Sequence, residues 1–414
     1  MSDPVAAAAR DAARFPALWR TVCALGIAQI VSWGTLYYTV AVLGGPMARE
    51  LDVDAVVLFG SFTAGLLASG LISPWVGRQI DGRGGRPVLS AGSVLGAIAM
   101  ALLSWATGPW TLFAGWVLAG IASGFALYDP AFATLHRIAG ASYRRAVTVL
   151  TLFGGFASTV FWPLSQLLLD TVGWRDAFAV YAGLHLALCL PIHLAFVPGE
   201  AAASPAADAE PDAAAPPEPQ VRAPRHGEAV FAWLATALAL VAFIGSAMAA
   251  HVIGLLTATG LTARDAVLVG SLIGPMQVAG RVMEFTFGRH LRALAVGTLA
   301  FALMVIALAL FTQVHGVWIV ALVFAIPYGW SNGVMTIVRG TVPAELFGQR
   351  NYGALLGRLA RPQFFAKAVA PVALTLLFAV DPARIWTPYA LLLLGAAAFG
   401  AYRLAVRAAG RGVA

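Results

Sequence analysis

Charged and amide side chains within apolar stretches are the features of this sequence with the clearest chemical potential. Gln277 and Arg281 lie four residues apart in an otherwise apolar stretch, and Glu284 follows one turn later. Lys367 interrupts a second apolar stretch. Residues four apart share one face of a helix. A charge at the centre of a membrane-spanning helix costs at least ~2.5–3.5 kcal/mol, so these side chains need partners or a ligand that offset the cost.

The elements that must position these residues are membrane-spanning helices. Of the 414 residues, 60% are hydrophobic and only 11% are charged, and the mean hydropathy is +0.82. Apolar stretches of ~20 residues recur, each long enough at ~1.5 Å per residue to cross a hydrocarbon core of ~30 Å. Because hydrocarbon offers the backbone no hydrogen-bond partners and the stretches do not alternate with period two, we expect helices and not a barrel. The expected crossings, with ends uncertain by ~2–4 residues, are 18–48, 55–77, 87–107, 110–136, 145–169, 176–197, 229–258, 265–288, 291–314, 316–340, 352–380 and 384–407.

The crossings divide into two groups of six around a polar segment. Residues 198–227 are rich in Ala, Pro, Asp and Glu and have too little apolar surface to offset chain entropy, so we expect a disordered linker. The predicted fold class is an all-α membrane protein with twelve transmembrane helices in two six-helix halves. The predicted parts are an N-terminal tail (1–17), a first half (18–197), the linker, a second half (228–407) and a C-terminal tail (408–414).

The distribution of arginine predicts the orientation in the membrane. Cytoplasmic loops retain positive charge, and an even number of crossings places both termini on one side. That side carries most of the arginines between crossings, so both tails and the linker are expected to be cytoplasmic. The net charge of +7 is thereby explained by topology, and no nucleic-acid partner is expected.

The sequence lacks the motifs that would indicate an enzyme, a metal site or a disulfide framework. Cys23 and Cys189 are the two cysteines, and both fall in predicted helices, which disfavours a disulfide framework or a thiolate metal site. The sequence contains no CxxC, HExxH, P-loop or GxSxG arrangement. We therefore expect no catalytic residues, no metal site and no cofactor.

The connection between the second and third crossings is the most informative loop. It reads Gly77-Arg-Gln-Ile-Asp81-Gly-Arg83-Gly84-Gly85-Arg86-Pro87, and its glycines permit a tight reversal. We expect Asp81 to pair with a basic residue on a neighbouring helix end as a cytoplasmic latch, so Gly77, Asp81, Gly84 and Arg86 are candidate gate residues. The corresponding segment 288–292 has no acid, so any second latch is expected to be degenerate. The alternative is a solvated basic turn.

This loop, together with the two groups of six crossings, resembles the signature of the major facilitator superfamily. The resemblance implies two pseudo-symmetric halves that rock about a midplane site. Two other segments, Tyr143-Arg144-Arg145-Ala146 and Trp33-Gly34-Thr35-Leu36-Tyr37-Tyr38, resemble the monocarboxylate and oxalate:formate branch of that superfamily. Drug:proton antiporters usually carry an arginine in the fourth helix and Gly-Pro in the fifth, and this sequence has neither.

The resemblance also implies a substrate site. In the oxalate:formate family a helix-eight arginine and a helix-eleven lysine hold the substrate carboxylates, and Arg281 and Lys367 fall at these positions. Two cations facing one cavity favour an anion. Further candidates for substrate binding are Gln277, Tyr37 and Trp330. Alternatively, Arg281 pairs with Glu284, while Lys367 pairs with Asp129 or extends to the interface.

Monocarboxylate carriers place an aspartate four residues before the helix-eight arginine, where this sequence has Gln277. If protons are coupled, Asp129 and Glu284 are therefore the candidates. The resulting hypothesis is a monomeric secondary transporter of a small organic anion, such as a mono- or dicarboxylate, in a bacterial inner membrane. It would work by proton symport or anion exchange. The alternatives are an efflux pump for drugs or toxic compounds and a membrane sensor without turnover.

Overall fold

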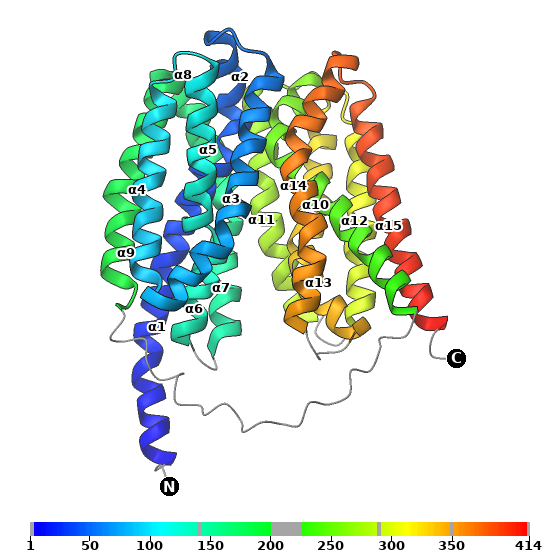
Figure 1. Cartoon of the computed structure of the whole chain (residues 1–414). Coiled ribbons are helices and arrows are strands. Elements are labelled where there is room, and N and C mark those ends of the chain that lie inside the picture. Colours follow the sequence, from blue (N-terminus) through cyan, green and yellow to red (C-terminus); the bar gives the residue numbers. More distant parts are fainter. Residues whose placement is uncertain (1–3, 140–141, 200–225, 288–290, 348–351, 412–414) are drawn as a thin grey trace. The chain divides into compact units, whose positions relative to one another are not determined.

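The computed structural model describes residues 4–139, 142–199, 226–287, 291–347 and 352–411. Within these ranges all regular secondary structure is helical (Figure 1). The predicted linker 198–227 lies almost entirely outside the described residues, as do positions 288–290 of the segment after the eighth crossing. The chain divides into two compact units. Unit 1 is formed by Met1–Tyr37, Ala64–Ala157 and Thr171–Pro219, and unit 2 by Tyr38–Thr63, Ser158–Asp170 and Gln220–Ala414.

Unit 1 is a bundle of long helices interrupted by two short π-helical turns. The part of α3 from Ala64 onward belongs to unit 1. The part of α8 from Thr171 onward also belongs to it, and this part contains a break in the helix at Gly173. The elements that contribute to unit 1 are α1 (Pro4–Trp33), η1 (Gly34–Tyr38), α3 (Ala55–Arg83), α4 (Gly85–Ser104), α5 (Pro109–Ala126), α6 (Tyr128–Ala139), α7 (Tyr143–Gly155), α8 (Ala157–Leu184), η3 (His185–Cys189) and α9 (Leu190–Phe196).

The number of crossings follows from a reversal inside α8. Among the described residues, eleven apolar helical stretches are long enough to span a membrane, and one of them, Arg145–Phe196, contains 52 residues. A straight helix of that length would measure ~80 Å, more than twice the ~30 Å hydrocarbon core. Gly173 breaks it with φ 82° and ψ 170°, a conformation essentially restricted to glycine. This stretch therefore makes two crossings, and the prediction of twelve is confirmed.

Unit 2 contains the remaining six long helices of the described residues, the whole of α2, and the first parts of α3 and α8. Helices α11 and α12 both pack along α13, and helices α14 and α15 pack along α10. Its elements are α2 (Val40–Glu50), α10 (His226–Ala258), α11 (Ala263–Phe287), α12 (Ala293–Phe311), α13 (Trp318–Phe347), α14 (Tyr352–Val380) and α15 (Thr387–Arg411).

Glycines allow α11 and α13 to approach each other closely. A Cβ atom on Gly333 of α13 would overlap the backbone carbonyl of Gln277, and one on Gly280 of α11 would lie 2.9 Å from the Cα of Trp330. Gly329 and Gly333 are four residues apart, the small-residue spacing that brings membrane helices into backbone contact. The close packing of the two helices therefore places the Gln277–Arg281 face of α11 against the Trp330–Gly333 turn of α13.

Candidate functional site

Arg281 is a buried cation held against α13. Its side chain is only 8% exposed. The Nε group donates to the carbonyl oxygen of Gly333 at 3.4 Å, and Nη2 donates to the hydroxyl of Thr336 at 3.4 Å. The backbone of one helix thus fixes the guanidinium of another. A charge kept inside a membrane protein at this cost is a functional-site hypothesis by default.

Gln277 and Trp330 lie beside this arginine at the same helix crossing. Gln277 is half-buried one turn before Arg281. The indole nitrogen of Trp330 is buried and has no hydrogen-bond acceptor among the described residues. A buried donor left without an acceptor costs ~1–3 kcal/mol, so a ligand oxygen at this position would be stabilised. The structure therefore brings together three of the predicted substrate-binding residues.

Lys367 and Glu284 occupy less constrained positions in unit 2. Lys367 is half-buried on α14, which packs mainly on α10 and only marginally on α13. Its sharing a cavity with Arg281 stays a prediction. Glu284 is half-buried three residues after Arg281 on the same helix, within the spacing at which helical side chains interact.

Tyr37, the substrate-binding candidate of unit 1, belongs to a group of aromatic residues around η1. Tyr37 is 5% exposed in this π-helix, and its ring meets that of Trp33 edge-on at 5.3 Å. Trp33 also contacts Tyr128, with 5.0 Å between ring centroids. The next residue, Asp129, is exposed in the first turn of α6. Asp129, the proton-coupling candidate of unit 1, thus directly follows Tyr128 of this aromatic group in the sequence.

The loop between α3 and α4 adopts the tight reversal that its glycines predict. Gly84 has φ 79° and ψ 171°, which L side chains rarely adopt. Arg137, near the end of α6, donates to the backbone carbonyls of Ile80, at 2.8 Å, and of Asp81. Arg86 donates from Nε to the carbonyl of Val197 at 2.6 Å. Gly77 lies in open space within α3. In this loop a basic residue therefore reaches the Asp81 backbone, whereas pairing through the Asp81 carboxylate stays a prediction.

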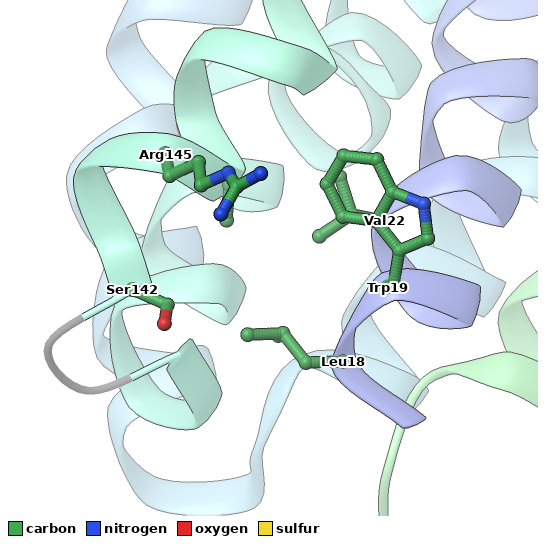
Figure 2. A pocket seen from close by; sticks show the side chains of 6 residues that line it. Leu18, Trp19, Val22, Ser142 and Arg145 are labelled. Carbon is green, nitrogen blue, oxygen red and sulfur yellow. The ribbon is translucent and has the colours of Figure 1, made fainter. Parts of the chain in front are cut away.

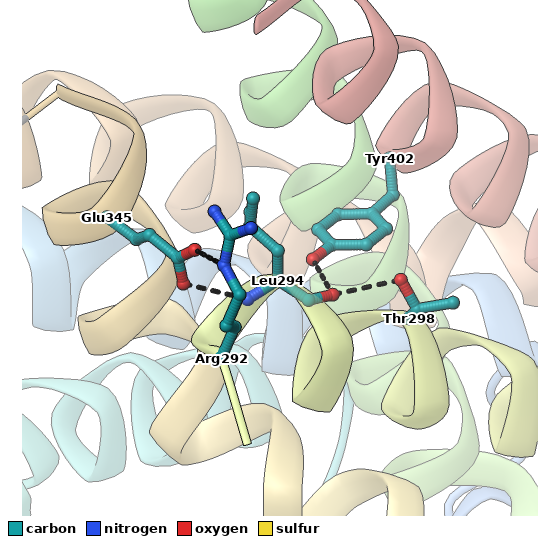
Figure 3. Close-up of polar contacts among 5 residues, drawn as sticks. All are labelled: Arg292, Leu294, Thr298, Glu345 and Tyr402. Carbon is teal, nitrogen blue, oxygen red and sulfur yellow. Dashed lines mark hydrogen bonds and ion pairs between the residues drawn. The ribbon is translucent and has the colours of Figure 1, made fainter. Parts of the chain in front are cut away.

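The corresponding region of unit 2 has an ion pair that the sequence did not predict. Arg292 and Glu345 are joined by a 3.0 Å contact between Nε and Oε1, and the Leu294 amide donates to the other carboxylate oxygen at 3.1 Å (Figure 3). The hydroxyls of Thr298 and Tyr402 both donate to the Leu294 carbonyl, at 2.9 and 2.8 Å. The expectation of a degenerate second latch is corrected here, because α13 supplies the acid that segment 288–292 lacks.

A small, mostly apolar hollow lies between α1 and α7 of unit 1. Figure 2 shows Arg145 and Trp19 at its sides and Leu18 and Ser142 below them. Arg145 belongs to the segment that resembles the monocarboxylate branch. The hollow has almost no polar surface, so we do not assign the substrate to it.

Asp381 fixes the connection between α14 and α15, outside the membrane-spanning segments. Its carboxylate accepts hydrogen bonds of 2.9 Å from the amides of Ile385, Trp386 and Thr387 and from the Thr387 hydroxyl. Burial acts to raise the pKa of Asp381, but the hydrogen bonds outweigh it and the pKa lies below its ordinary value. Asp381 is thus a charged cap at the start of α15.

Reasoning from sequence missed three contacts, those made by Arg137, Glu345 and Arg281. Arg137 and Glu345 had been assigned no partner, although each stands near the end of a crossing, where a charge can satisfy a helix terminus. The anchoring of Arg281 by Gly333 was also missed, although the Gly329–Gly333 spacing was a usable signal.

Twelve membrane-spanning segments, with buried polar residues where two of the helices pack together, define a polytopic membrane protein. A sequence model of the Major Facilitator Superfamily matches residues 25–283, more than half of the chain. The chain belongs to this family. It is a multi-pass membrane protein of a transporter family.

Among characterised proteins, the chain is similar to monocarboxylate transporter 11. The human protein is 34% identical over 161 residues, which are 37% of this chain and 31% of that protein. The mouse protein is 36% identical over 143 residues, which are 33% of this chain and 29% of that protein. The similarity thus spans about a third of the length of these relatives.

Solved transporter structures share the fold over more than nine-tenths of the chain. The nucleoside transporter NupG matches with a TM-score of 0.68 at 13% identity, covering 93% of this chain and 99% of NupG. A D-xylose-proton symporter matches with a TM-score of 0.69 at 16% identity, covering 91% and 96%. A bacterial homolog of the human lysosomal transporter Spinster matches with 0.63 at 13%, covering 94% of each chain. At these identities the likeness shows the fold alone.

Proposed function

We propose that this transporter moves a small organic anion, such as a mono- or dicarboxylate, by proton symport or anion exchange. The proposal is carried by the buried guanidinium of Arg281 on α11 together with the indole N–H of Trp330 on the adjoining α13, which has no acceptor among the described residues. A carboxylate can accept hydrogen bonds from a guanidinium and from an indole N–H.

The proposed roles follow from chemistry and position. Arg281 is the planar anchor for a carboxylate, Lys367 adds a compact positive charge, and Gln277 and Trp330 orient the anion through hydrogen bonds. Tyr37 is a further proposed substrate-binding residue, and Asp129 and Glu284 are the proposed proton carriers. The similarity to monocarboxylate transporter 11 supports a carboxylate over a nucleoside or a sugar.

We further propose a monomer in the inner membrane of a bacterium, with both termini in the cytoplasm. Under this orientation the loop with Gly77, Asp81, Gly84 and Arg86 forms part of a cytoplasmic gate. The contact between Arg137 and the Asp81 carbonyl supports a gate that closes by tying the end of α6 to this loop.

The test is uptake and counterflow of a panel of labelled mono- and dicarboxylates in proteoliposomes. We expect saturable flux that Arg281→Gln reduces at least ~10-fold, because loss of one charge-assisted contact removes ~1.5–3 kcal/mol. Lys367→Gln is expected to act in the same direction. Exposed arginines on the same two helices give matched controls, Arg264→Gln on α11 and Arg361→Gln on α14, and both should leave flux unchanged.

Unchanged carboxylate flux after loss of both Arg281 and Lys367 would contradict the anion site. Absence of flux for the whole panel, together with sensitisation of a deletion strain to hydrophobic toxic compounds, would favour an efflux pump instead.

A further inference from the structure

Two fully buried histidines in unit 1 have no part in the proposed anion site. His185 and His193 are both 0% exposed. His185 opens the π-helical turn η3, and His193 lies in α9, which follows it in the same crossing. π-helical turns are rare and often occur at functional sites. Both rings pack on α4, where a Cβ on Gly96 would lie 2.8 Å from the His185 ring and where Ser93 contacts His193.

Hydrogen bonding determines which His185 nitrogen carries the proton. The hydroxyl of Thr35 donates to the carbonyl of Val31 at 2.9 Å. It must therefore accept from His185, whose Nε2 lies 2.8 Å away. The Nε2 atom then carries the hydrogen, and Nδ1 presents a lone pair. This Nδ1 is buried and has no partner among the described residues.

The same reasoning applies to His193 with the two nitrogens exchanged. The Ser93 hydroxyl is directed at the carbonyl of Leu89 at 3.4 Å and contacts Nδ1 of His193 at 2.8 Å. Nδ1 therefore donates, and Nε2 presents a lone pair that meets no donor within the described part of the chain. Each imidazole thus has its hydrogen committed and its basic nitrogen open.

The helices around the pair place few other titratable groups near it. The elements that pack on η3 and α9 are α1 and α4. The titratable and charged groups of α1 are Arg10, Asp11, Arg14, Arg20 and Cys23, and α4 adds Arg86. The crossing itself adds Arg175, Asp176, Tyr181 and Cys189, and η1 adds Tyr37 and Tyr38. The carboxylate of the crossing, Asp176, lies nine residues before His185.

We infer that His185 is a proton-accepting site coupled to transport, in addition to the proposed proton carriers Asp129 and Glu284. The inference rests on the proposed symport of an anion. In the step, a proton from water adds to the lone pair of His185 Nδ1, giving an imidazolium that later returns the proton to water. Burial disfavours this cation, whereas a bound carboxylate favours it. Thr35, which accepts from His185, shares the η1 turn with Tyr37, so protonation of His185 acts on the turn that carries a proposed substrate-binding residue.

The direct test does not require a substrate. The full chain, labelled with ¹⁵N in its histidine rings and reconstituted in liposomes, is followed by solid-state NMR from about pH 8 to about pH 5, where histidine ordinarily titrates. We expect one of the rings that change from neutral to imidazolium signals to be missing in His185→Gln and to be kept in His315→Gln. If His185→Gln does not fold, Thr35→Val assigns the ring by shifting its signal. The exposed His315 provides the control variant His315→Gln.

Transport then separates the two proposals. We expect carboxylate uptake to lose its rise at acid pH in His185→Gln and to keep it in His315→Gln. A His185 ring that stays neutral down to about pH 5 overturns the proton site even if carboxylate is transported. A ring that titrates in a protein without carboxylate flux supports the proton site and overturns the proposed substrate.

Discussion

Each unit connects a loop to the end of a neighbouring helix, through a positively charged side chain in unit 1 and a negatively charged one in unit 2. In unit 1, Arg137 at the end of the fourth crossing donates to the carbonyls of Ile80 and Asp81 at the end of α3. In unit 2, Glu345 at the end of the tenth crossing accepts from Arg292 and from the Leu294 amide at the start of α12. A cation at a helix C-terminus and an anion at a helix N-terminus are both favourable. The contact between corresponding elements is kept although its charges are reversed.

This comparison shows that a latch cannot be recognised from the loop alone. The loop of unit 1 contains an acid and takes part through its backbone, whereas the residues described for unit 2 contribute a base and take the acid from α13. What the two regions share is a helix end that needs capping and a charge within reach on a neighbouring crossing.

The largest expected effect concerns the glycine that reverses the unit 1 loop. Gly84→Ala forces a side chain into φ 79° and ψ 171°, which costs ~1–3 kcal/mol. We expect a clear fall in the midpoint of thermal unfolding in detergent. Gly82→Ala, two residues earlier in helical backbone and open space, is the matched control and should not lower the midpoint. Equal midpoints for the two variants would show that the reversal tolerates a side chain.

Asp381 extends the comparison to a buried capping carboxylate. Asp381→Asn should lower stability by ~1 kcal/mol, because hydrogen bonds to a charged acceptor contribute more than hydrogen bonds to a neutral one. Since its pKa is lowered in the folded protein, its contribution is complete above the ordinary value of ~3.9 and is lost as the pH falls below it. The difference between wild type and variant should therefore be constant from neutral pH to about pH 5 and shrink in stronger acid. A difference that grows towards acid pH would contradict this assignment.

Removing the base of the unit 1 contact should have a smaller effect. Arg137→Gln withdraws a charged donor from two carbonyls, and partial exposure limits the loss to ~1 kcal/mol. The exposed Arg78 on α3 gives the control variant Arg78→Gln, for which we expect no change in unfolding midpoint. If both variants unfold alike, the contact of Arg137 with α3 adds nothing to stability.

The ion pair of unit 2 should contribute least. The Arg292 side chain is 80% exposed, and exposed pairs contribute ~0.2–1 kcal/mol that salt screens. A double-mutant cycle of Arg292→Gln and Glu345→Gln, measured at low and high salt, should give a coupling in this range that decreases with salt. A salt-independent coupling above ~2 kcal/mol would instead indicate a buried, structural pair.

Much of the architecture could be predicted from sequence because it depends on local properties. Hydropathy over ~20 residues determines each crossing, so twelve crossings were predicted with nearly their observed ends. The need for glycine in the loop before α4 was also local, and Gly84 meets it with a positive φ. Gln277 and Arg281 could be placed on one face by spacing alone.

The sequence by itself thus determined the membrane-spanning helices, the tight reversals and the set of charges buried among them. Only the tertiary structure decided which partners these charges meet, since the Arg281–Gly333 contact joins positions 52 residues apart and the His185–Thr35 contact joins positions 150 apart. The physical reason is that a helix forms from bonds within its own segment, whereas its side-chain partners depend on which backbones the small residues allow to approach.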